Sequence, residues 1–309
     1  MKKYYEAYYM MTALCNLSCS YCVLENSPLQ LSQELPLERK KELIMHLYNN
    51  FNVRALTISG GEPLCIGNNA GLDFISLMEF LKQLKSDNPQ DNLVVKMYSN
   101  SLLMTDVIVS SMQGVVDSVS INIDSCNDSI LQKIGRTNNR NGSFFRNAIN
   151  SIQLLYNYNI EVKLHTVVSA LNYNRIAFEA KTIYMNVKEA NPLMKKWKFY
   201  QYMSYDNPAK DIKHVISIED FRKVCDDISV TLDGCDVKTQ FKSVEEMNES
   251  LFNILATGIA QYRRDNDTWS TTKRTKSLFD YKSMDDMLTD NGIQSDLFDK
   301  YHLYNILEK

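Results

Sequence analysis

Strand-like apolar runs alternate with amphipathic helical stretches through the first two thirds of this 309-residue chain. Strands are predicted where β-branched and aromatic residues concentrate, at 6–13, 53–59, 93–98, 117–123, 160–168 and 197–203. Helices are predicted between them, near 36–50, 72–86, 104–113, 144–158 and 173–190. Six strands that alternate with helices are typical of a parallel α/β sheet.

Two α/β architectures fit this alternation. A partial six-stranded (β/α)6 barrel suits the chain length and the period, and a doubly wound open sheet is the alternative that periodicity alone does not separate. The alternation is expected to stop near residue 205, at the turn-rich segment YDNPAKD. An acidic helix at 218–229, a strand pair around Gly258 and a terminal helical stretch are predicted to follow. We therefore expect a barrel over 1–205 and a C-terminal extension over 206–309 that completes the substrate pocket.

The charge balance restricts the partners of the chain. Its 34 basic and 37 acidic residues give a net charge of -3, so no global basic field exists to gather nucleic acid. An anionic ligand must instead be held by locally placed cations. No stretch approaches the roughly 18 uncharged apolar residues of a membrane span, and the N-terminus does not resemble a signal peptide. We expect a cytoplasmic protein without stable nucleic-acid or membrane binding.

Three of the seven cysteines lie within the segment CNLSCSYC, directly after the first predicted strand. Cys15, Cys19 and Cys22 have the spacing C-x3-C-x2-C, and three thiolates on one loop can converge on one inorganic centre. An iron–sulfur cluster is usually held by four cysteines, so three would leave one iron open to a non-protein ligand. A structural zinc site prefers four closed ligands. A zinc-stabilised binding protein is therefore the weaker alternative, and three unrelated buried cysteines are weaker still.

This loop, with Tyr21 before its last cysteine, resembles the cluster loop of the radical S-adenosylmethionine (SAM) superfamily. The segment SGGEP at 59–63 follows the second strand and is similar to the GGEP motif of that superfamily. The resemblance implies a [4Fe–4S] cluster on the three cysteines and SAM on the open iron. Glycine lets the main chain approach a ligand closely, and βα barrels build their sites at the carboxyl ends of strands.

The fifth and sixth strands carry cations on one face. Under the two-residue period of a strand, Lys163 shares a face with His165, and Lys196 shares a face with Lys198 and Tyr200. The apolar faces of these strands should meet the helices, which leaves the cations inside the barrel. Buried cations need a counter-charge, and a polyanion such as a triphosphate would supply it. The alternative is that these lysines are solvated at frayed strand ends.

Several blocks also resemble the viperin family, the nucleotide-modifying branch of the superfamily. They are YSNS at 98–101, DS at 124–125, IGR at 134–136, VKLHTVV at 162–168, KWKFYQ at 196–201 and TKS at 275–277. The resemblance implies a radical SAM enzyme that converts CTP, UTP or GTP to its 3'-deoxy-3',4'-didehydro analogue. This product terminates polymerase chains and would serve antiviral, in bacteria anti-phage, defence. A radical SAM enzyme acting on a different phosphorylated small molecule is the alternative.

The resemblance also assigns roles by motif, and it names no catalytic side chain. The expected SAM contacts are Tyr21, Ser59, Gly60, Gly61, Glu62, Asn100, Asn122 and Arg136. The expected nucleotide contacts are Lys163, His165, Lys196, Lys198 and Lys276. A flavodoxin- or ferredoxin-type protein is the expected electron donor. Tyr301 stands where the family has a phosphate-binding arginine, and His165 stands where the animal enzyme has asparagine.

Overall fold

The computed structural model describes residues 2–24, 32–137, 142–249, 251–263 and 272–305. These residues form one ten-stranded sheet in the order β10-β9-β8-β1-β2-β3-β4-β5-β6-β7. The parallel strands are β1 (Tyr5–Met10), β2 (Val53–Ser59), β3 (Val94–Ser99), β4 (Ser118–Asn122), β5 (Glu161–Val168), β6 (Lys196–Gln201) and β7 (Lys238–Lys242). These strands are neighbours in chain order, whereas a doubly wound sheet reverses its order at a switch point. The doubly wound alternative is therefore excluded.

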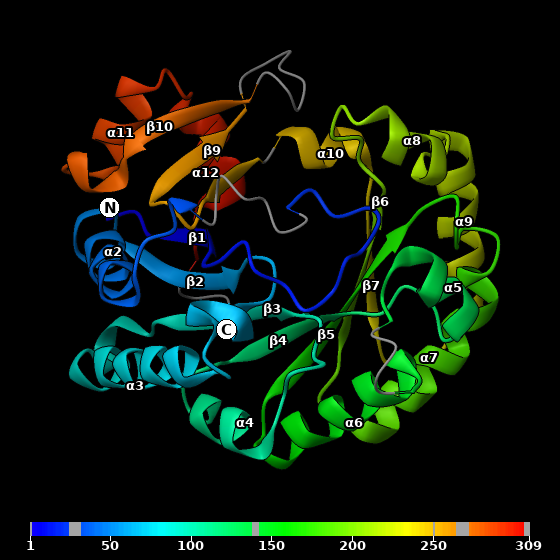
Figure 1. Ribbon diagram of the computed structural model, residues 1–309. Helices are drawn as coiled ribbons and strands as arrows, with labels where there is room; N and C mark the ends of the chain where they lie inside the picture. The colour runs from blue at the N-terminus through cyan, green and yellow to red at the C-terminus, as the bar shows by residue number, and fades with distance from the viewer. Residues whose placement is uncertain (1, 25–31, 138–141, 250, 264–271, 306–309) are drawn as a thin grey trace.

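Helices follow the parallel strands and cover the outer face of the curved sheet (Figure 1). They are α2 (Leu37–Asn50), α3 (Leu72–Asp87), α4 (Asp106–Met112), α5 (Asp128–Ile134), α6 (Phe144–Asn157), α7 (Ile176–Ala190), α8 (Pro208–His214) and α9 (Ile218–Thr231), with the short 3₁₀ helices η1 (Pro63–Asn68) and η2 (Pro89–Asp91). Helix α6 illustrates the pattern, because Phe144, Ala148, Ile152 and Leu155 recur at helical spacing and are all buried. Among the described strands, β7 and β10 end the sheet, so the predicted partial barrel is confirmed, with β7 as a parallel strand beyond the six expected.

The alternation does not stop near residue 205, and that expectation is wrong. Helices α8 and α9 lead to β7, which pairs in parallel with β6. The segment KTQFK escaped detection because it lies at the sheet edge, where its side chains are only partly covered. Helix α5 also escaped detection, since its seven residues are too few for a periodic pattern.

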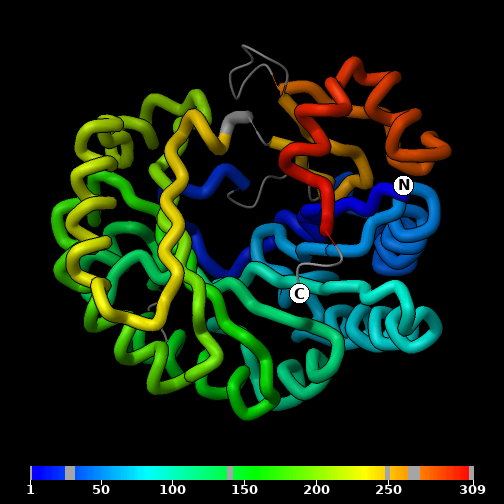
Figure 2. The backbone as a smooth tube through the Cα atoms, turned by 180° about the vertical axis from the view of Figure 1, so that it is seen from behind, coloured from blue at the N-terminus to red at the C-terminus, as the bar shows by residue number. Residues whose placement is uncertain are grey.

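The C-terminal part extends the sheet on the side of β1. Its elements are α10 (Val244–Glu249), β8 (Phe252–Ile254), β9 (Ile259–Tyr262), β10 (Lys273–Ser277), the 3₁₀ helix η4 (Leu278–Asp280), α11 (Met284–Asp290) and α12 (Ser295–His302). Strand β8 pairs in parallel with β1 and antiparallel with β9, which is the strand pair expected around Gly258. Figure 2 shows this part beside the N-terminal strand. Within the described ranges, no helix is long and apolar enough to cross a membrane.

Candidate active site

The residues expected to contact SAM meet at the carboxyl ends of the first four strands. Ser59 is the last residue of β2, and Asn122 is the last residue of β4. Asn100 directly follows β3, and the cysteine loop follows β1. Because parallel strands present their carboxyl ends at the same edge of a sheet, this end is where a barrel builds its site. Segments far apart in the chain therefore share one end of the barrel.

The loop after β1 carries Cys15, Cys19 and Cys22 as partly exposed thiols that form no disulfide. Burial raises the pKa of Cys15 to about 11 and that of Cys19 to about 12, while the Arg136 guanidinium opposes the rise at Cys19. Such thiols lose their protons when a metal binds. Within the described part of the chain, no three His, Cys, Asp or Glu side chains are arranged to hold one metal ion. Three thiols on one loop suit an iron–sulfur cluster, in which each thiolate would bind a different iron.

Backbone contacts from α5 support the cysteine loop. The Ser20 amide donates to the Ile134 carbonyl of α5 at 2.7 Å. Within the loop itself, the Cys22 amide donates to the Cys19 carbonyl at 2.9 Å. Gly135 ends α5 with a φ of 84°. A Cβ atom on Gly135 would lie 2.3 Å from the Ser18 carbonyl oxygen. Only glycine therefore lets α5 end directly against the loop.

A buried network joins the cysteine loop to the end of β4. The Tyr21 hydroxyl donates to Asp124 Oδ2 at 2.7 Å, and Arg136 Nε lies 2.5 Å from the same oxygen. Arg136 also donates to the Tyr21 hydroxyl, and its Nη1 donates to the Asn122 carbonyl at 3.3 Å. The Asp124 charge raises the pKa of Arg136 against the effect of burial. Arg136, expected to contact SAM, is thus placed where it orients Tyr21.

The glycines of the SGGEP segment pack against the segment after β1. The Gly61 amide donates to the Thr12 carbonyl at 2.8 Å, and the Glu62 amide donates to the Leu14 carbonyl at 2.7 Å. A Cβ atom would lie 2.1 Å from the Leu14 carbonyl oxygen at Gly61 and 2.4 Å from the Thr12 carbonyl oxygen at Gly60. The two glycines therefore let the ends of β1 and β2 approach each other.

The Glu62 carboxylate is fully buried and links the ends of β2 and β3. It accepts hydrogen bonds from the Asn100 amide at 2.7 Å, the Ser99 hydroxyl at 2.9 Å and the Leu64 amide at 3.3 Å. Burial nevertheless raises the pKa of Glu62 to about 7. The Asn100 side chain continues this link, since its Nδ2 lies 3.7 Å from the Cys15 sulfur. Glu62 thereby positions a residue that contacts the cysteine loop.

The cations of β5 and β6 lie on the inner face of the sheet. Trp197 and Phe199 are fully buried on the opposite face, toward the helices. His165 pairs with Lys198 across the two strands, and the register places Lys163 beside Lys196. The structure therefore brings Lys163, His165, Lys196 and Lys198 together.

The electrostatics of this cation group favour an anionic ligand. Burial, and then the Lys196 charge, lower the pKa of Lys198 to about 8. Burial, and then the Lys198 charge, lower the pKa of His165 to about 3, so its imidazole is neutral. Tyr98 and Tyr200 hold this ring edge-on, with centroids 4.8 and 5.2 Å away. A bound anion would relieve the repulsion between these cations.

Other cations are placed differently from the sequence-based expectation. Lys276 is not part of the inner group, because its side chain is 68% exposed and its Nζ lies 3.2 Å from Asp290. Lys96 was missed, although the alternation in LVVKMYS places it on the same face as Tyr98. Its Nζ lies 2.8 Å from Glu6 of β1. Lys238, which pairs with Lys196, was missed because β7 was not predicted.

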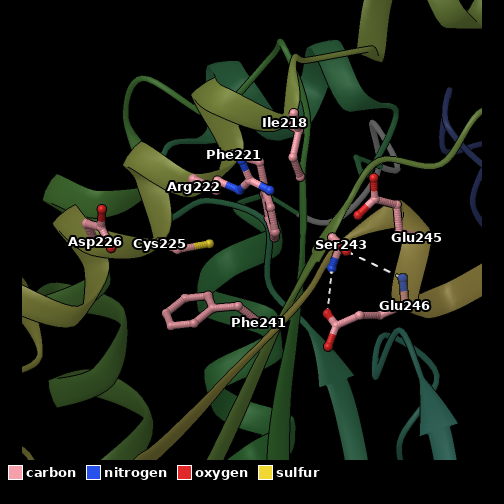
Figure 3. A pocket seen from close by; sticks show the side chains of 9 residues that line it. All are labelled: Ile218, Phe221, Arg222, Cys225, Asp226, Phe241, Ser243, Glu245 and Glu246. Carbon is pink, nitrogen blue, oxygen red and sulfur yellow. Dashed lines mark hydrogen bonds between the residues drawn. The ribbon is translucent and has the colours of Figure 1, made fainter.

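A separate pocket of about 240 Å³ lies between α9, β7 and α10. Phe241 forms part of its wall and stacks on Phe199 with centroids 5.4 Å apart, on the helix-covered side of the sheet. Figure 3 shows Arg222, Cys225 and Glu245 around it. None of the residues expected to bind SAM or nucleotide lines this pocket, so it is not the candidate active site.

The profile of the Radical SAM superfamily matches residues 9–179, which include the end of β1, the cysteine loop, the SGGEP segment and β2 to β5. This chain belongs to the radical SAM superfamily. Membership implies a [4Fe–4S] cluster and SAM as cofactors, and the partly buried thiols at a barrel end fit that pair.

Several curated relatives share the name S-adenosylmethionine-dependent nucleotide dehydratase. An S-adenosylmethionine-dependent nucleotide dehydratase from Flammeovirga pacifica is 25% identical over 196 residues, covering 61% of this chain but only 59% of that protein. One from a Thermoplasmatales archaeon is 24% identical over 260 residues and covers 81% and 80% of the two chains. A GTP 3',8-cyclase from Chlorobaculum tepidum is 27% identical over 115 residues, covering 37% and 31%.

Solved structures support the fold. Streptococcus suis SuiB bound to S-adenosylmethionine superposes with a TM-score of 0.66 over 96% of this chain and 67% of that chain. The sequence identity is 13%, so the likeness extends to the fold alone.

Proposed function

We propose that this chain is a radical SAM nucleotide dehydratase of the viperin type, acting on a nucleoside triphosphate such as CTP, UTP or GTP. The observation that carries the proposal is the inner group of three lysines, Lys163, Lys196 and Lys198, with the neutral His165 among them. The lysines lie on the inner face toward the amino ends of β5 and β6, whereas the cysteine loop lies at the carboxyl end of the barrel. The name shared by the Flammeovirga and archaeal relatives supports the same substrate class.

In this proposal Cys15, Cys19 and Cys22 hold the [4Fe–4S] cluster, which with SAM supplies a 5'-deoxyadenosyl radical. Asn100 and the glycines of 60–61 shape the SAM site, and Glu62, Ser59, Asn122, Tyr21 and Arg136 fix the strand ends around it. The inner lysines hold the triphosphate. The substrate loses the ribose C4' hydrogen atom to the radical. A proton and one electron from a flavodoxin- or ferredoxin-type donor then release the 3'-hydroxyl as water. The chain-terminating product would act in defence against phage.

We also propose that residues 206–309, which include the parallel strand β7, complete the substrate pocket of the barrel begun by residues 1–205. Strand β7 places Lys238 beside Lys196, and β8 pairs with β1. Residues 206–309 thus contribute a strand beside β6 and a strand beside β1. Lys276 is not included in this pocket, because its side chain is exposed and pairs with Asp290.

Anaerobic turnover of the reconstituted enzyme tests the proposal. CTP, UTP and GTP are each supplied with SAM and a reductant, and 5'-deoxyadenosine and the nucleotide product are measured by mass. We expect a product lighter than its substrate by one water. A product that is an isomer of GTP would instead indicate a cyclase, the activity named for the Chlorobaculum relative. If no nucleotide raises 5'-deoxyadenosine formation, the substrate is not a nucleotide.

A further inference from the structure

The cysteine loop is held from a second side by α8, the short helix that follows β6. Lys210 Nζ donates to the Cys22 carbonyl oxygen at 2.7 Å. His214 Nε2 lies 2.9 Å from the Ser20 hydroxyl. One residue of α8 therefore contacts the backbone of a cysteine, and another contacts the residue that follows Cys19. Ser20 joins this contact to the α5 contact, because its hydroxyl also donates to the Ile134 carbonyl at 3.1 Å. The Lys210 contact uses a different loop residue, Cys22.

His214 is built into this contact rather than placed on the surface. It is completely buried, its ring meets that of Tyr21 edge-on at 6.0 Å, and it packs on Tyr202 at 5.1 Å. Its carbonyl accepts from the Ala170 amide at 3.0 Å, which ties α8 to the end of β5. Its Nδ1 atom has no hydrogen-bond partner. A buried imidazole with one unsatisfied nitrogen is unfavourable, and the partner of its other nitrogen is the loop residue Ser20.

We propose that Lys210 and His214 are positioning residues that clasp the cysteine loop and pre-organise its thiols for cluster binding. The proposal rests on the proposed function only in taking Cys15, Cys19 and Cys22 as the cluster ligands. The segment that carries the clasp continues directly from β6, the strand of Lys196 and Lys198. Helix α8 has only seven residues, and two of them, Lys210 and His214, contact the cysteine loop.

The Lys210 contact is tested in the apo protein, where no cofactor is required. Lys210→Met removes the donor to Cys22, and Lys213→Met is the matched control, because Lys213 lies exposed on the same helix. The rate at which an alkylating reagent modifies Cys22 is measured by mass spectrometry, with Cys225 and Cys235 as internal references outside the loop. We expect about three- to tenfold faster alkylation in Lys210→Met, the effect of losing one hydrogen bond. Equal rates in the two variants would overturn the Lys210 contact.

The His214 contact is tested by a double-mutant cycle with Ser20. Ser20→Ala and His214→Leu should each accelerate alkylation of Cys19, and the double variant should be no faster than the faster single variant. His214→Gln retains a hydrogen-bonding side chain and should restore most of the protection. Additive effects, or no effect in Ser20→Ala, would overturn the contact. If His214→Leu does not fold, Ser20→Ala and His214→Gln still decide it.

The same variants are then reconstituted with iron and sulfide, and the loss of iron in air is followed by absorbance. Faster loss in Lys210→Met than in Lys213→Met supports the clasp as part of the cluster site. If the two variants lose iron at the same rate but differ in alkylation rate, the contact acts only in the apo protein. That result would contradict a role of the clasp in the cluster site. Because neither measurement uses a nucleotide, failure of the dehydratase proposal leaves both results interpretable.

Discussion

Glu62 is a buried acid whose ionisation should be visible in the stability of the apo protein. Burial raises its pKa from 4.5 to about 7. The folded state therefore favours the protonated acid, and this contribution is full below pH 4.5 and is lost as the pH rises through about 7. We expect wild type to lose up to about 1.4 kcal/mol per pH unit relative to Glu62→Gln over this interval. Urea unfolding from pH 5 to 8 measures the difference, and parallel pH profiles would contradict it.

The ionisation of His165 changes stability with pH in the opposite direction to that of Glu62. The wild type must therefore be compared with Glu62→Gln to isolate the effect of Glu62. The pKa of His165 is lowered from 6.5 to about 3, so the folded state favours the neutral ring. Stability from this group is present above pH 6.5 and is lost as the pH falls through about 3. The two effects overlap in wild type, and the variant removes only the Glu62 effect.

Lys198 should contribute strongly to triphosphate binding, and Lys276 should not. Lys198 is partly buried, and burial and the Lys196 charge lower its pKa to about 8. It is still mostly charged near pH 7, so an anion that binds there would offset the unfavourable burial of this charge. A charge-assisted hydrogen bond is worth about 1.5–3 kcal/mol, so Lys198→Met should weaken nucleotide binding by roughly one to two decades. Lys276→Met, which removes an exposed pairing with Asp290, should change it little. The dissociation constants of a triphosphate and its monophosphate are measured for both variants. An equal loss of triphosphate affinity in Lys198→Met and Lys276→Met would disprove the assignment.

Residue-level prediction succeeded where a short-range rule was sufficient. Two-residue alternation placed Lys163 and Lys198 on the inner face without knowledge of the partner strands. Lys276 could not be placed in this way, because its exposure depends on β9, β10 and α11 packing together. The ion pair between Arg136 and Asp124 likewise joins side chains that no local pattern connects.

At the scale of elements, the junction between α5 and the cysteine loop should be intolerant of any side chain. Gly135 and Gly114 share a positive φ, of 84° and 72°, but only Gly135 faces a neighbour, the Ser18 carbonyl oxygen. Alanine at either position meets backbone strain of order 1–3 kcal/mol. Gly135→Ala should cost about 1–3 kcal/mol more than Gly114→Ala and should also lower iron content after reconstitution. The unfolding midpoints and the iron content of the two variants test this prediction. If both substitutions lower stability equally, the loop adjusts freely to the added side chain.

Elements were predictable when they were long and apolar. The strand at 53–59 was predicted with the bounds of β2, and the helix at 144–158 ends one residue beyond α6. The helix α8 and the strand β7 were missed because each is short and polar. Strand β7 is fixed by pairing with β6, which is information that its own five residues do not contain.

At the scale of the whole molecule, the continuous sheet should make residues 1–205 and 206–309 unfold together. Strand β7 pairs with β6, β8 pairs with β1, and α12 packs on β1 through Phe298 and Tyr5 at 5.8 Å. Phe298 also meets Phe252 at 5.1 Å and is 4% exposed. Truncation of a buried phenylalanine costs about 3–5 kcal/mol, so Phe298→Ala should lower the unfolding midpoint of the entire chain.

Hydrogen exchange read out by segment is the measurement for this prediction. In Phe298→Ala, amides of β5 in the barrel should lose protection by the same free energy as amides of β8 and β9, because one cooperative unit opens as a whole. Phe178→Ala is the matched control, since Phe178 is 79% exposed on α7 and its truncation removes little buried area. If only the C-terminal segments lose protection, the extension opens independently of the barrel. The substrate pocket would then be completed by a part that can detach, and nucleotide binding to wild type should slow exchange in β8 and β9 selectively.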